Sequence, residues 1–258
     1  MSADILVIDG LEKSFGGLRA IDGLDLTISE GQIKSIIGPN GAGKTTLFNL
    51  ITGVFLPTKG VSLFLGKTLK GLKAHEIACL GISRTFQNVE LFVHMSAIEN
   101  VMLGRHRRER TGIFKAGLRL SGMRQEEKES RELAFAELSF MGLAEKADLD
   151  ALSLPLGEQK LLEIARALAT EPKLILLDEP AAGLNPRDTA KLSETILRIR
   201  ERGITVMLVE HDMSLVMEVS DEVAVLNYGK KIAEGTPREI QRNPEVIAAY
   251  LGEEGNGA

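Results

Sequence analysis

The stretch GPNGAGKTT, residues 38–46, places three glycines, one lysine and two threonines in the pattern G-x-x-x-x-G-K-[ST]. Glycines let backbone amides curl around phosphate oxygens, the lysine reaches the outer phosphates, and the first threonine hydroxyl binds Mg²⁺. An ordinary Gly-rich turn is the alternative, but a strand-like run precedes the stretch and helical spacing follows it. We therefore predict a P-loop whose phosphate-binding residues are Gly38, Pro39, Asn40, Gly41, Ala42, Gly43, Lys44, Thr45 and Thr46, with Thr45 also on Mg²⁺.

Two neighbouring carboxylates end the apolar run LILLDEP, residues 174–180. Asp178 at the end of a buried strand can hold Mg²⁺ through its water shell, and Glu179 can polarise a water molecule for attack on a phosphate. A plain helix-capping carboxylate is the alternative, because Asp and Pro commonly follow strands. The presence of a P-loop in the same chain favours the catalytic interpretation.

His211 and Gln87 follow two further strand-like runs, in LVEHD and GISRTFQN. Either residue alone is uninformative, and a surface or hydrogen-bonded histidine would be the default interpretation. In an open parallel sheet, however, ligands bind outside the carboxyl ends of the strands. If these strands are parallel, the P-loop, the carboxylate pair, Gln87 and His211 converge on one nucleotide.

The elements that must position these groups follow from the hydrophobic pattern. Short apolar stretches at residues 5–8, 24–28 and 33–37, separated by glycine-bearing turns at 16–17, 22–23 and 30–31, predict short strands. The runs KLILLDEP and ITVMLVEHD are continuously apolar, as in parallel strands that are buried on both faces. The segment between them reads as a helix, which makes a βαβ unit.

The middle of the chain differs from its two ends. Leu133, Leu138 and Met141 recur at helical spacing within EEKESRELAFAELSFMGL, so we predict a mostly helical insertion at about residues 90–170. Near the C-terminus, VAVLNYGKKIAEG predicts a hairpin, and Thr236 and Asn243 each precede a proline as helix caps.

Composition bounds the possible functions. The 258 residues, 44% of them hydrophobic, suffice for a sizeable core, and a net charge of −5 gives no general argument for nucleic-acid binding. The single cysteine, Cys79, has apolar neighbours, which predicts a buried thiol and a reducing compartment. We find no basic signal-peptide start and no apolar run of the ~20 residues that span a bilayer, so we expect a soluble intracellular chain.

The order of these motifs resembles that of the ATP-binding cassette (ABC) ATPases over essentially the whole chain. The motifs follow one another in the order typical of that family: the P-loop, Gln87, LPLGEQ, LILLDEP, AGLN and His211. The resemblance implies an α/β fold: a P-loop NTPase core with a mainly parallel sheet, an N-terminal antiparallel β subdomain and the inserted helical subdomain, all in one nucleotide-binding domain at 1–258. It also implies that two subunits pair head to tail, each ATP lying between the P-loop of one and the signature helix of the other.

The resemblance assigns roles to residues that match the family's motifs. Asp178 and Gln87 are expected to be Mg²⁺ ligands, Glu179 the catalytic base, and His211 the switch residue at the γ-phosphate; Gln87 also contacts the attacking water. Phe15 falls where an aromatic ring stacks on adenine, although tyrosine is commoner there and a small core phenylalanine is the alternative.

The signature motif departs from the family's usual L-S-G-G-Q. Aligned on Gly157, the chain reads LPLGEQ, so Pro155 replaces the serine whose hydroxyl contacts the partner's ATP. Using Ser153 instead would misplace Gly157. We still expect Gly157 and Glu158 to contact nucleotide, because the free amides and the dipole at a helix start favour phosphate. Asn185 in AGLN is a second departure, since the general pattern ends in Asp.

Longer stretches, such as RTFQNVELFVHMSAIENVMLG and EGTPREIQRNPEVIAAYLGE, resemble the ATPase subunits of branched-chain amino acid importers. The expected partners are a second ATPase subunit (a paralogue or a second copy), transmembrane permease subunits and, indirectly, an external substrate-binding protein, at the cytoplasmic face of the membrane. Urea or amide import and lipopolysaccharide export are the alternatives among transporters. The lipopolysaccharide ATPase typically lacks about twenty residues found here near 105–125.

Other classes fit the sequence less well. A soluble ABC ATPase acting on DNA or ribosomes usually carries two cassettes or a coiled-coil insertion, and a P-loop kinase or GTPase lacks the signature and switch motifs.

Residues 104–125 form a basic stretch with seven Lys/Arg residues and only one acidic residue, Glu109. A solvated loop is the default interpretation, contact with anionic lipid or an acidic permease loop is next, and nucleic-acid binding is disfavoured.

Overall fold

The computed structural model describes residues 3–85, 89–105 and 120–254, and its centre is a six-stranded sheet in the order β10-β9-β3-β8-β7-β6. Neighbouring strands are parallel except at the edge, where β10 runs antiparallel to β9. The strands are β3 (Ile33–Ile37), β6 (Ile82–Arg84), β7 (Leu174–Asp178), β8 (Thr205–Val209), β9 (Glu222–Asn227) and β10 (Lys230–Gly235). The predicted parallel strands and C-terminal hairpin are confirmed.

Burial on both faces explains the continuously apolar runs predicted around β7 and β8. Every residue of β3, β7 and β8 is buried. Along β7, Ile175 and Leu177 join the core shared with α5 (Leu156–Leu168) and α6 (Pro186–Glu201), whereas Leu174 and Leu176 join the core shared with α1 (Lys44–Ile51). The sheet therefore lies between helices, and the polar groups that follow its strands share one edge.

A second, antiparallel sheet is formed by β2 (Leu18–Ser29), β1 (Asp4–Phe15), β4 (Lys59–Phe64) and β5 (Lys67–Thr68). The predicted turn at 16–17 is confirmed, but the turn at 22–23 is wrong, because Gly23 lies inside one of two twelve-residue strands. Gly10 and Gly23 have φ angles of 53° and 67°, and the β1–β2 register shifts beside them. These glycines form bulges that bend the strands without ending them.

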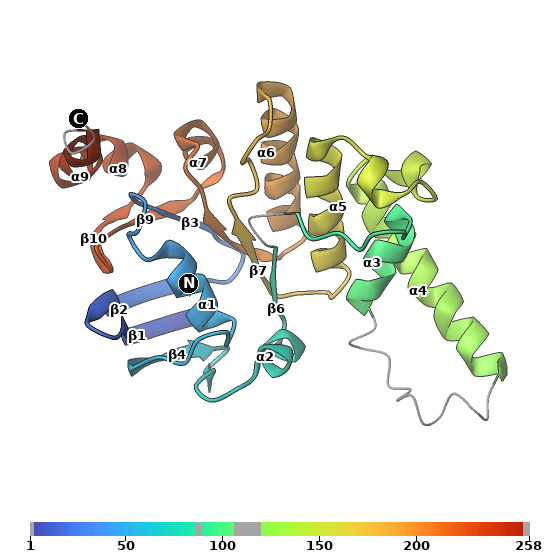
Figure 1. Cartoon of the computed structure of the whole chain (residues 1–258), viewed down its shortest axis with the longest axis horizontal. Coiled ribbons are helices and arrows are strands. Elements are labelled where there is room, and N and C mark those ends of the chain that lie inside the picture. Colours follow the sequence, from blue (N-terminus) through green and yellow to red (C-terminus); the bar gives the residue numbers. More distant parts are fainter. Residues whose placement is uncertain (1–2, 86–88, 106–119, 255–258) are drawn as a thin grey trace.

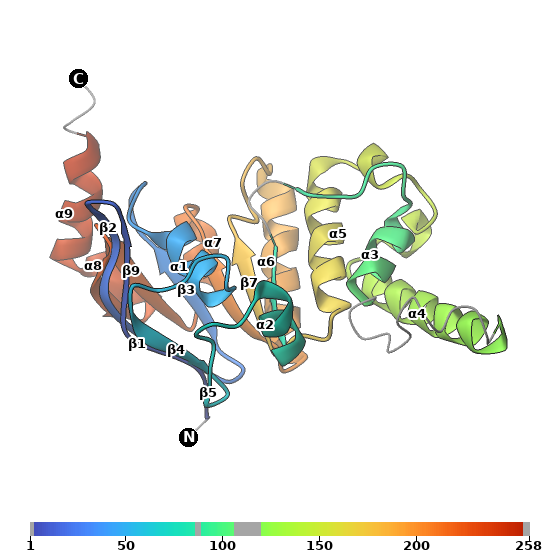
Figure 2. The same cartoon turned by 60° about the horizontal axis from the view of Figure 1, so that its bottom comes forward.

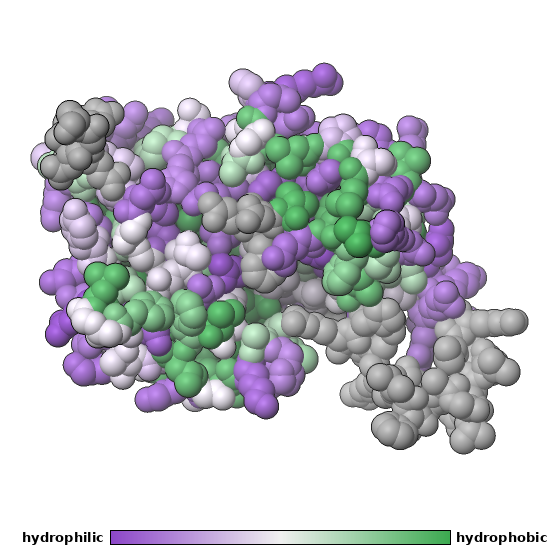
Figure 3. Space-filling view, viewed as in Figure 1, coloured by the Kyte–Doolittle hydropathy of each residue, from purple (hydrophilic) through white to green (hydrophobic). Residues whose placement is uncertain are grey.

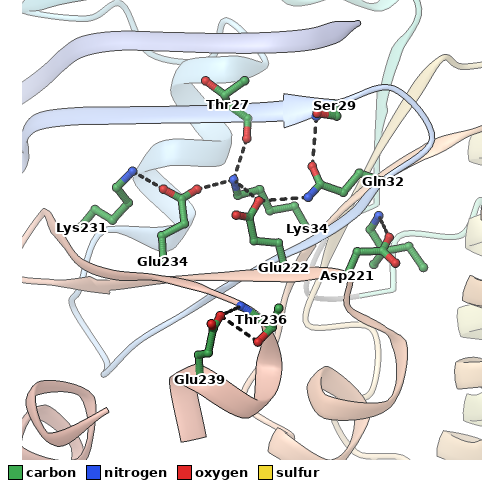
Figure 4. Close-up of polar contacts among 11 residues, drawn as sticks. Thr27, Ser29, Gln32, Lys34, Asp221, Glu222, Lys231, Glu234, Thr236 and Glu239 are labelled. Atoms are coloured by element: carbon green, nitrogen blue, oxygen red, sulfur yellow. Dashed lines mark hydrogen bonds and ion pairs between the residues drawn. The ribbon is translucent and has the colours of Figure 1, made fainter. Parts of the chain in front are cut away.

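A buried lysine connects the two sheets. Lys34 of β3 is 1% exposed, and its ammonium donates to the Thr27 carbonyl of β2 at 2.6 Å and to the Glu222 carboxylate at 2.9 Å. It also forms an ion pair with Glu234 of β10, as Figure 4 shows. One cation thus holds the edge of the parallel sheet against the antiparallel sheet, and the burial of its charge is balanced by two carboxylates.

Helices α3 (Ala97–Arg105), α4 (Leu120–Phe140) and α5 come between β6 and β7. Figures 1 and 2 show α4 at the opposite end of the molecule from the antiparallel sheet. The predicted helical residues Leu138 and Met141 are buried, but Leu133 is 43% exposed and does not belong to the core. Residues 106–119 of the basic stretch 104–125 lie outside the described residues, and the bounds 90–170 of a separate subdomain stay a prediction.

The remaining helices are α2 (Ala74–Leu80), α7 (Met213–Val219), α8 (Pro237–Arg242) and α9 (Pro244–Glu254). Both predicted caps are confirmed: Thr236 forms a capping box with Glu239, and the Asn243 side chain accepts from the Glu245 amide. The predicted burial of Cys79 is wrong, because the residue is exposed on α2. Across the described ranges, none of the helices is both long and apolar enough to cross a bilayer.

Candidate functional site

The P-loop connects β3 to α1, and close contacts require two of its three glycines, Gly38 and Gly43. Gly38 and Gly43 have φ angles of 147° and 106°, which side chains rarely adopt. A Cβ atom on Gly38 would lie 2.0 Å from the Leu226 carbonyl oxygen, and one on Gly43 would lie 2.5 Å from the Ala20 carbonyl oxygen. The loop is therefore packed against β9 and β2, which fixes the direction of its amides.

The start of α1 can accept an anion. Its N-cap, Gly43, supplies no side-chain hydrogen bond, so the first amides of the helix have no cap from a side chain. Lys44 is buried, and its ammonium donates to the carbonyls of Gly38 and Pro39 at 2.5 and 2.9 Å. Thr45 is exposed at the same helix start. Amides, ammonium and hydroxyl together form the donor set that phosphate needs.

The carboxylate pair lies where the sequence predicts it. Asp178 ends β7 and is 2% exposed, and its Oδ2 accepts a hydrogen bond from Arg84 Nη2 at 2.7 Å. Glu179 follows with a φ of 47°, a conformation unfavourable for a non-glycine residue, and its amide donates to the Val209 carbonyl. This bond to β8 holds Glu179 at the edge of the sheet.

The structure brings Glu179 and His211 together. Nε2 of His211 lies 2.7 Å from Oε1 of Glu179, although the two residues follow different strands. The Glu179 side chain is 15% exposed and that of His211 is 41% exposed, so solvent reaches the pair. A carboxylate hydrogen-bonded to an imidazole at the carboxyl edge of a parallel sheet can accept a proton from water.

Glu210 is a site residue that the sequence analysis missed. The side chain is buried, and it accepts hydrogen bonds from the amides of Ala181 at 2.7 Å and His211 at 3.0 Å. Burial raises the pKa of its carboxyl, against the lowering effect of those amide bonds. Glu210 therefore joins the loop after β7 to the loop after β8. Its place between a buried strand and His211 was the signal that could have revealed it.

Phe15 is not a core residue, so that alternative is wrong. Its side chain is 42% exposed at the end of β1. It contacts Phe55 edge to face, with ring centroids 5.1 Å apart, and Lys13 Nζ lies 4.9 Å from the Phe15 centroid. An exposed ring anchored by a second ring is suited to stacking on a planar ligand.

The signature segment forms the start of α5. Pro155 is the N-cap, and its carbonyl accepts from the amides of Glu158 and Gln159 at 2.9 and 3.0 Å. The Ser153 hydroxyl donates to the Asp150 carbonyl. This bond agrees with the alignment on Gly157, in which Ser153 is not the serine of the signature motif. The Glu158 carboxylate pairs with Lys146 at 2.6 Å, so this side chain connects the start of α5 to the short 3₁₀ helix Ala144–Lys146.

Gly157 links this helix start to α6. A Cβ atom there would lie 2.8 Å from the Asp188 carboxyl group. Asn185 is the N-cap of α6, and its side chain bonds the Asp188 amide at 3.0 Å and the Asp188 carboxylate at 2.8 Å. The asparagine in AGLN therefore has a capping role. Because its amide donates to Asp188, an aspartate could not make the same pair of bonds.

The structure does not bring all predicted residues to one place. In both Figure 1 and Figure 2, β7 and α6 lie between α1, which carries the P-loop, and α5, which carries Gly157 and Glu158. Gln87 lies outside the described residues. The P-loop, Asp178, Glu179 and His211 share the sheet edge, whereas the signature segment is separate from them.

Comparison with known proteins agrees with this geometry. The ABC transporter family matches residues 21–182, and the branched-chain amino acid ATP-binding cassette transporter family matches residues 230–256. The chain is 47% identical to the high-affinity branched-chain amino acid transport ATP-binding protein BraF of Pseudomonas aeruginosa, over 98% of this chain and all of that protein. It is 45% identical to LivG of Escherichia coli, over the same shares.

Solved structures show the same fold. The ADP conformation of MJ1267, an ATP-binding cassette of an ABC transporter, matches 97% of this chain and all of its own at 32% identity, with a TM-score of 0.84. The dimeric post-hydrolysis state of the cassette MJ0796, bound to ADP and Pi, matches 90% of this chain and 99% of its own at 27% identity, with a TM-score of 0.76. The chain therefore belongs to the ABC transporter family, as one of its nucleotide-binding, ATP-hydrolysing proteins.

Proposed function

We propose that this ATPase binds Mg·ATP at the edge of the parallel sheet and drives the import of branched-chain amino acids. The observation that carries the proposal is the Glu179–His211 hydrogen bond beside the P-loop. In the proposed site, residues 38–46 cradle the phosphates, Phe15 stacks on adenine, and Thr45, Asp178 and Gln87 hold Mg²⁺. The donor set fits these ligands, since anionic phosphate meets amides and an ammonium, and Mg²⁺ meets oxygen atoms.

In this mechanism Glu179 is the general base, and it accepts a proton from the water that attacks the γ-phosphate. His211 fixes the Glu179 carboxylate through its Nε2 and lies close to the γ-phosphate. Bound Mg²⁺ supplies charge neutralisation on the β- and γ-phosphates. Glu210 accepts from the amides of Ala181 and His211, so it connects the loop that carries the base to the loop that carries the switch histidine.

We propose that the site is completed by a second ATPase subunit in a head-to-tail dimer. Within one chain, Gly157 and Glu158 lie on a different element from the P-loop, as Figures 1 and 2 show. The solved MJ0796 dimer supports pairing of such cassettes. Only the closed dimer makes the contacts between the signature helix and the γ-phosphate. ATP binding therefore favours closure, and hydrolysis lets the dimer open. The partner is a paralogue or a second copy.

The import assignment rests on the names and coverage of BraF and LivG. The closing and opening of the ATPase dimer would then move transmembrane permease subunits. An external substrate-binding protein would be an indirect partner, and nucleic acid would have no role. Figure 3 shows apolar side chains gathered over the face where α5 and the segment before α3 lie, and Phe92 and Val93 there are 52% and 58% exposed. We place this face against the permeases, at the cytoplasmic side of the membrane.

Reconstitution tests the transported class. The chain is placed in liposomes with the branched-chain amino acid permease subunits, the partner ATPase and the binding protein of the same organism. We expect ATP-dependent uptake of labelled leucine, isoleucine or valine, and hydrolysis stimulated by the loaded binding protein. Uptake of urea or amides alone, or stimulation only by lipopolysaccharide, would replace the amino acid assignment while keeping the ATPase mechanism.

Pro155→Ser tests the signature helix. The substitution adds the hydroxyl that the usual motif carries, and a hydrogen bond to a charged group contributes about 1.5–3 kcal/mol. We expect ATP-induced dimerisation of the isolated subunit to increase or to stay unchanged, as measured by light scattering with the Glu179→Gln background preventing turnover. The matched control is Ser153→Ala, which leaves the register untouched. A large loss of dimerisation would mean that the proline shapes the loop.

A further inference from the structure

Arg84 forms a buried ion pair with the proposed magnesium ligand. Its Nη2 lies 2.7 Å from Oδ2 of Asp178, and the two side chains are only 8% and 3% exposed. The same guanidinium donates through Nη1 to Asn49 Oδ1 at 2.7 Å, and its Cζ lies 5.4 Å from the centroid of the Phe48 ring. Arg84 thus joins β6, β7 and α1, the helix that follows the P-loop.

The chemistry of this pair bears on any cation that binds Asp178. Arginine stays protonated at all accessible pH values, so the positive charge beside Asp178 is permanent. A buried carboxylate without a partner is strongly unfavourable, and Arg84 supplies that partner when no metal is bound. A divalent cation at Asp178 shares the carboxylate with Arg84, and the positive charge of Arg84 repels the cation. This repulsion is weakly screened in a buried site.

The fork of the guanidinium makes the arrangement specific to arginine. One nitrogen binds Asp178 while the other binds Asn49, and the plane of the group packs near Phe48. A lysine ammonium has one nitrogen and could not span both oxygens in this geometry.

We propose that Arg84 is a positioning residue for the metal site, which orients the Asp178 carboxylate and lowers the site's affinity for Mg²⁺. The inference rests on the proposed function, in which Asp178 is a Mg²⁺ ligand. Its consequence is that the metal binds well only together with the phosphate charges of a nucleotide. Nucleotide at the P-loop and Mg²⁺ at Asp178 then bind together.

Arg84→Met tests the proposal, because methionine keeps the stem beside Phe48 and removes the charge. Mn²⁺ binding to the full chain is titrated by electron paramagnetic resonance, with and without a non-hydrolysable ATP analogue. We expect the variant to bind Mn²⁺ about tenfold more tightly, the fold-change of one charge-assisted hydrogen bond. The gain should be present without nucleotide, where the wild type binds the cation poorly. Unchanged or weaker Mn²⁺ binding overturns the proposal.

Two further variants separate the possible failures. Asp178→Asn should weaken Mn²⁺ binding in the presence of the analogue; wild-type binding by this variant would refute the metal site itself, whatever Arg84 does. Arg200→Met is the matched control, because it removes an arginine that pairs with Asp221 on the surface, and it should leave Mn²⁺ binding unchanged. If Arg84→Met does not fold, Arg84→Gln replaces it in the same titration, with tighter binding again expected and unchanged or weaker binding overturning the proposal.

Discussion

Glu179→Gln is expected to lower ATP turnover by at least about 100-fold while ATP binding persists, because a general base contributes about 10²–10⁴-fold. Glutamine has nearly the same shape, so it can still bond His211 across the 2.7 Å contact, but its amide cannot accept the proton of the attacking water. The closed dimer should then form on ATP and fail to separate. Phosphate release measures turnover, and size-exclusion chromatography with ATP measures the trapped dimer.

The strained backbone at Glu179 makes the control important. Its φ of 47° is held by the amide bond to Val209, and a side-chain change that relaxed this strain would also lower activity. ATP affinity measured by a fluorescent analogue distinguishes the two cases, since loop collapse would weaken binding as well. Glu194→Gln, at an exposed position on α6, is the matched control and should hydrolyse ATP normally. Near-normal hydrolysis by Glu179→Gln would remove Glu179 from the role of base.

Glu179 and His211, at the carboxyl edge of the parallel sheet, were predictable because each follows a strand with a clear apolar pattern. Strands β7 and β8 are fully buried and almost wholly apolar in sequence, so the polar residues at their ends stand out. Convergence of Glu179 with His211 then follows from parallel strands alone. The P-loop was predictable for a different reason, since Gly38 and Gly43 lie against backbone carbonyls that leave no room for a Cβ atom.

The partners of buried charges were not predictable from the sequence. Arg84 pairs with a residue 94 positions away, Lys34 pairs with one 188 positions away, and Glu210 bonds an amide 29 positions away. Periodicity reports which face of an element is apolar, but it does not report which distant charge reaches that face. The long strands β1 and β2 were missed because glycine marks bulges as well as turns. Cys79 was misplaced because three apolar neighbours do not fix the exposed face of a short helix.

Lys34→Met is expected to destabilise the fold by about 3 kcal/mol, the lower end of the range for removing one partner of a buried ion pair. The lysine side chain is 2% exposed, whereas its partners Glu222 and Glu234 are 34% and 24% exposed, so water can partly solvate the two carboxylates after the change. Methionine fills the volume of the lysine stem, and the lost contacts are the bonds to Thr27, Glu222 and Glu234. Urea denaturation of the isolated chain gives the free energy of unfolding.

Lys231→Met is the matched control for Lys34→Met. Lys231 also pairs with Glu234, but its side chain is 26% exposed, so the loss should be below about 1 kcal/mol. If both variants lose the same free energy, the burial of Lys34 is irrelevant to its contribution. A variant Lys34→Met that unfolds at the wild-type urea concentration would show that the two sheets pack without this cation.

The pH dependence of unfolding supplies an independent test of the same network. Burial opposes ionisation of Glu234, but hydrogen bonds from Lys231 and Lys34 prevail and lower its pKa below the ordinary value of 4.5. A carboxyl whose pKa is lower in the folded state stabilises the fold above its unfolded pKa, and that stabilisation is lost as pH falls through the folded pKa. The wild type should therefore lose stability below about pH 4.5, and Lys34→Met should lose less over the same interval, because one of the two cations that hold Glu234 ionised is gone. An identical acid loss in both proteins would assign the lowered pKa of Glu234 to Lys231 alone.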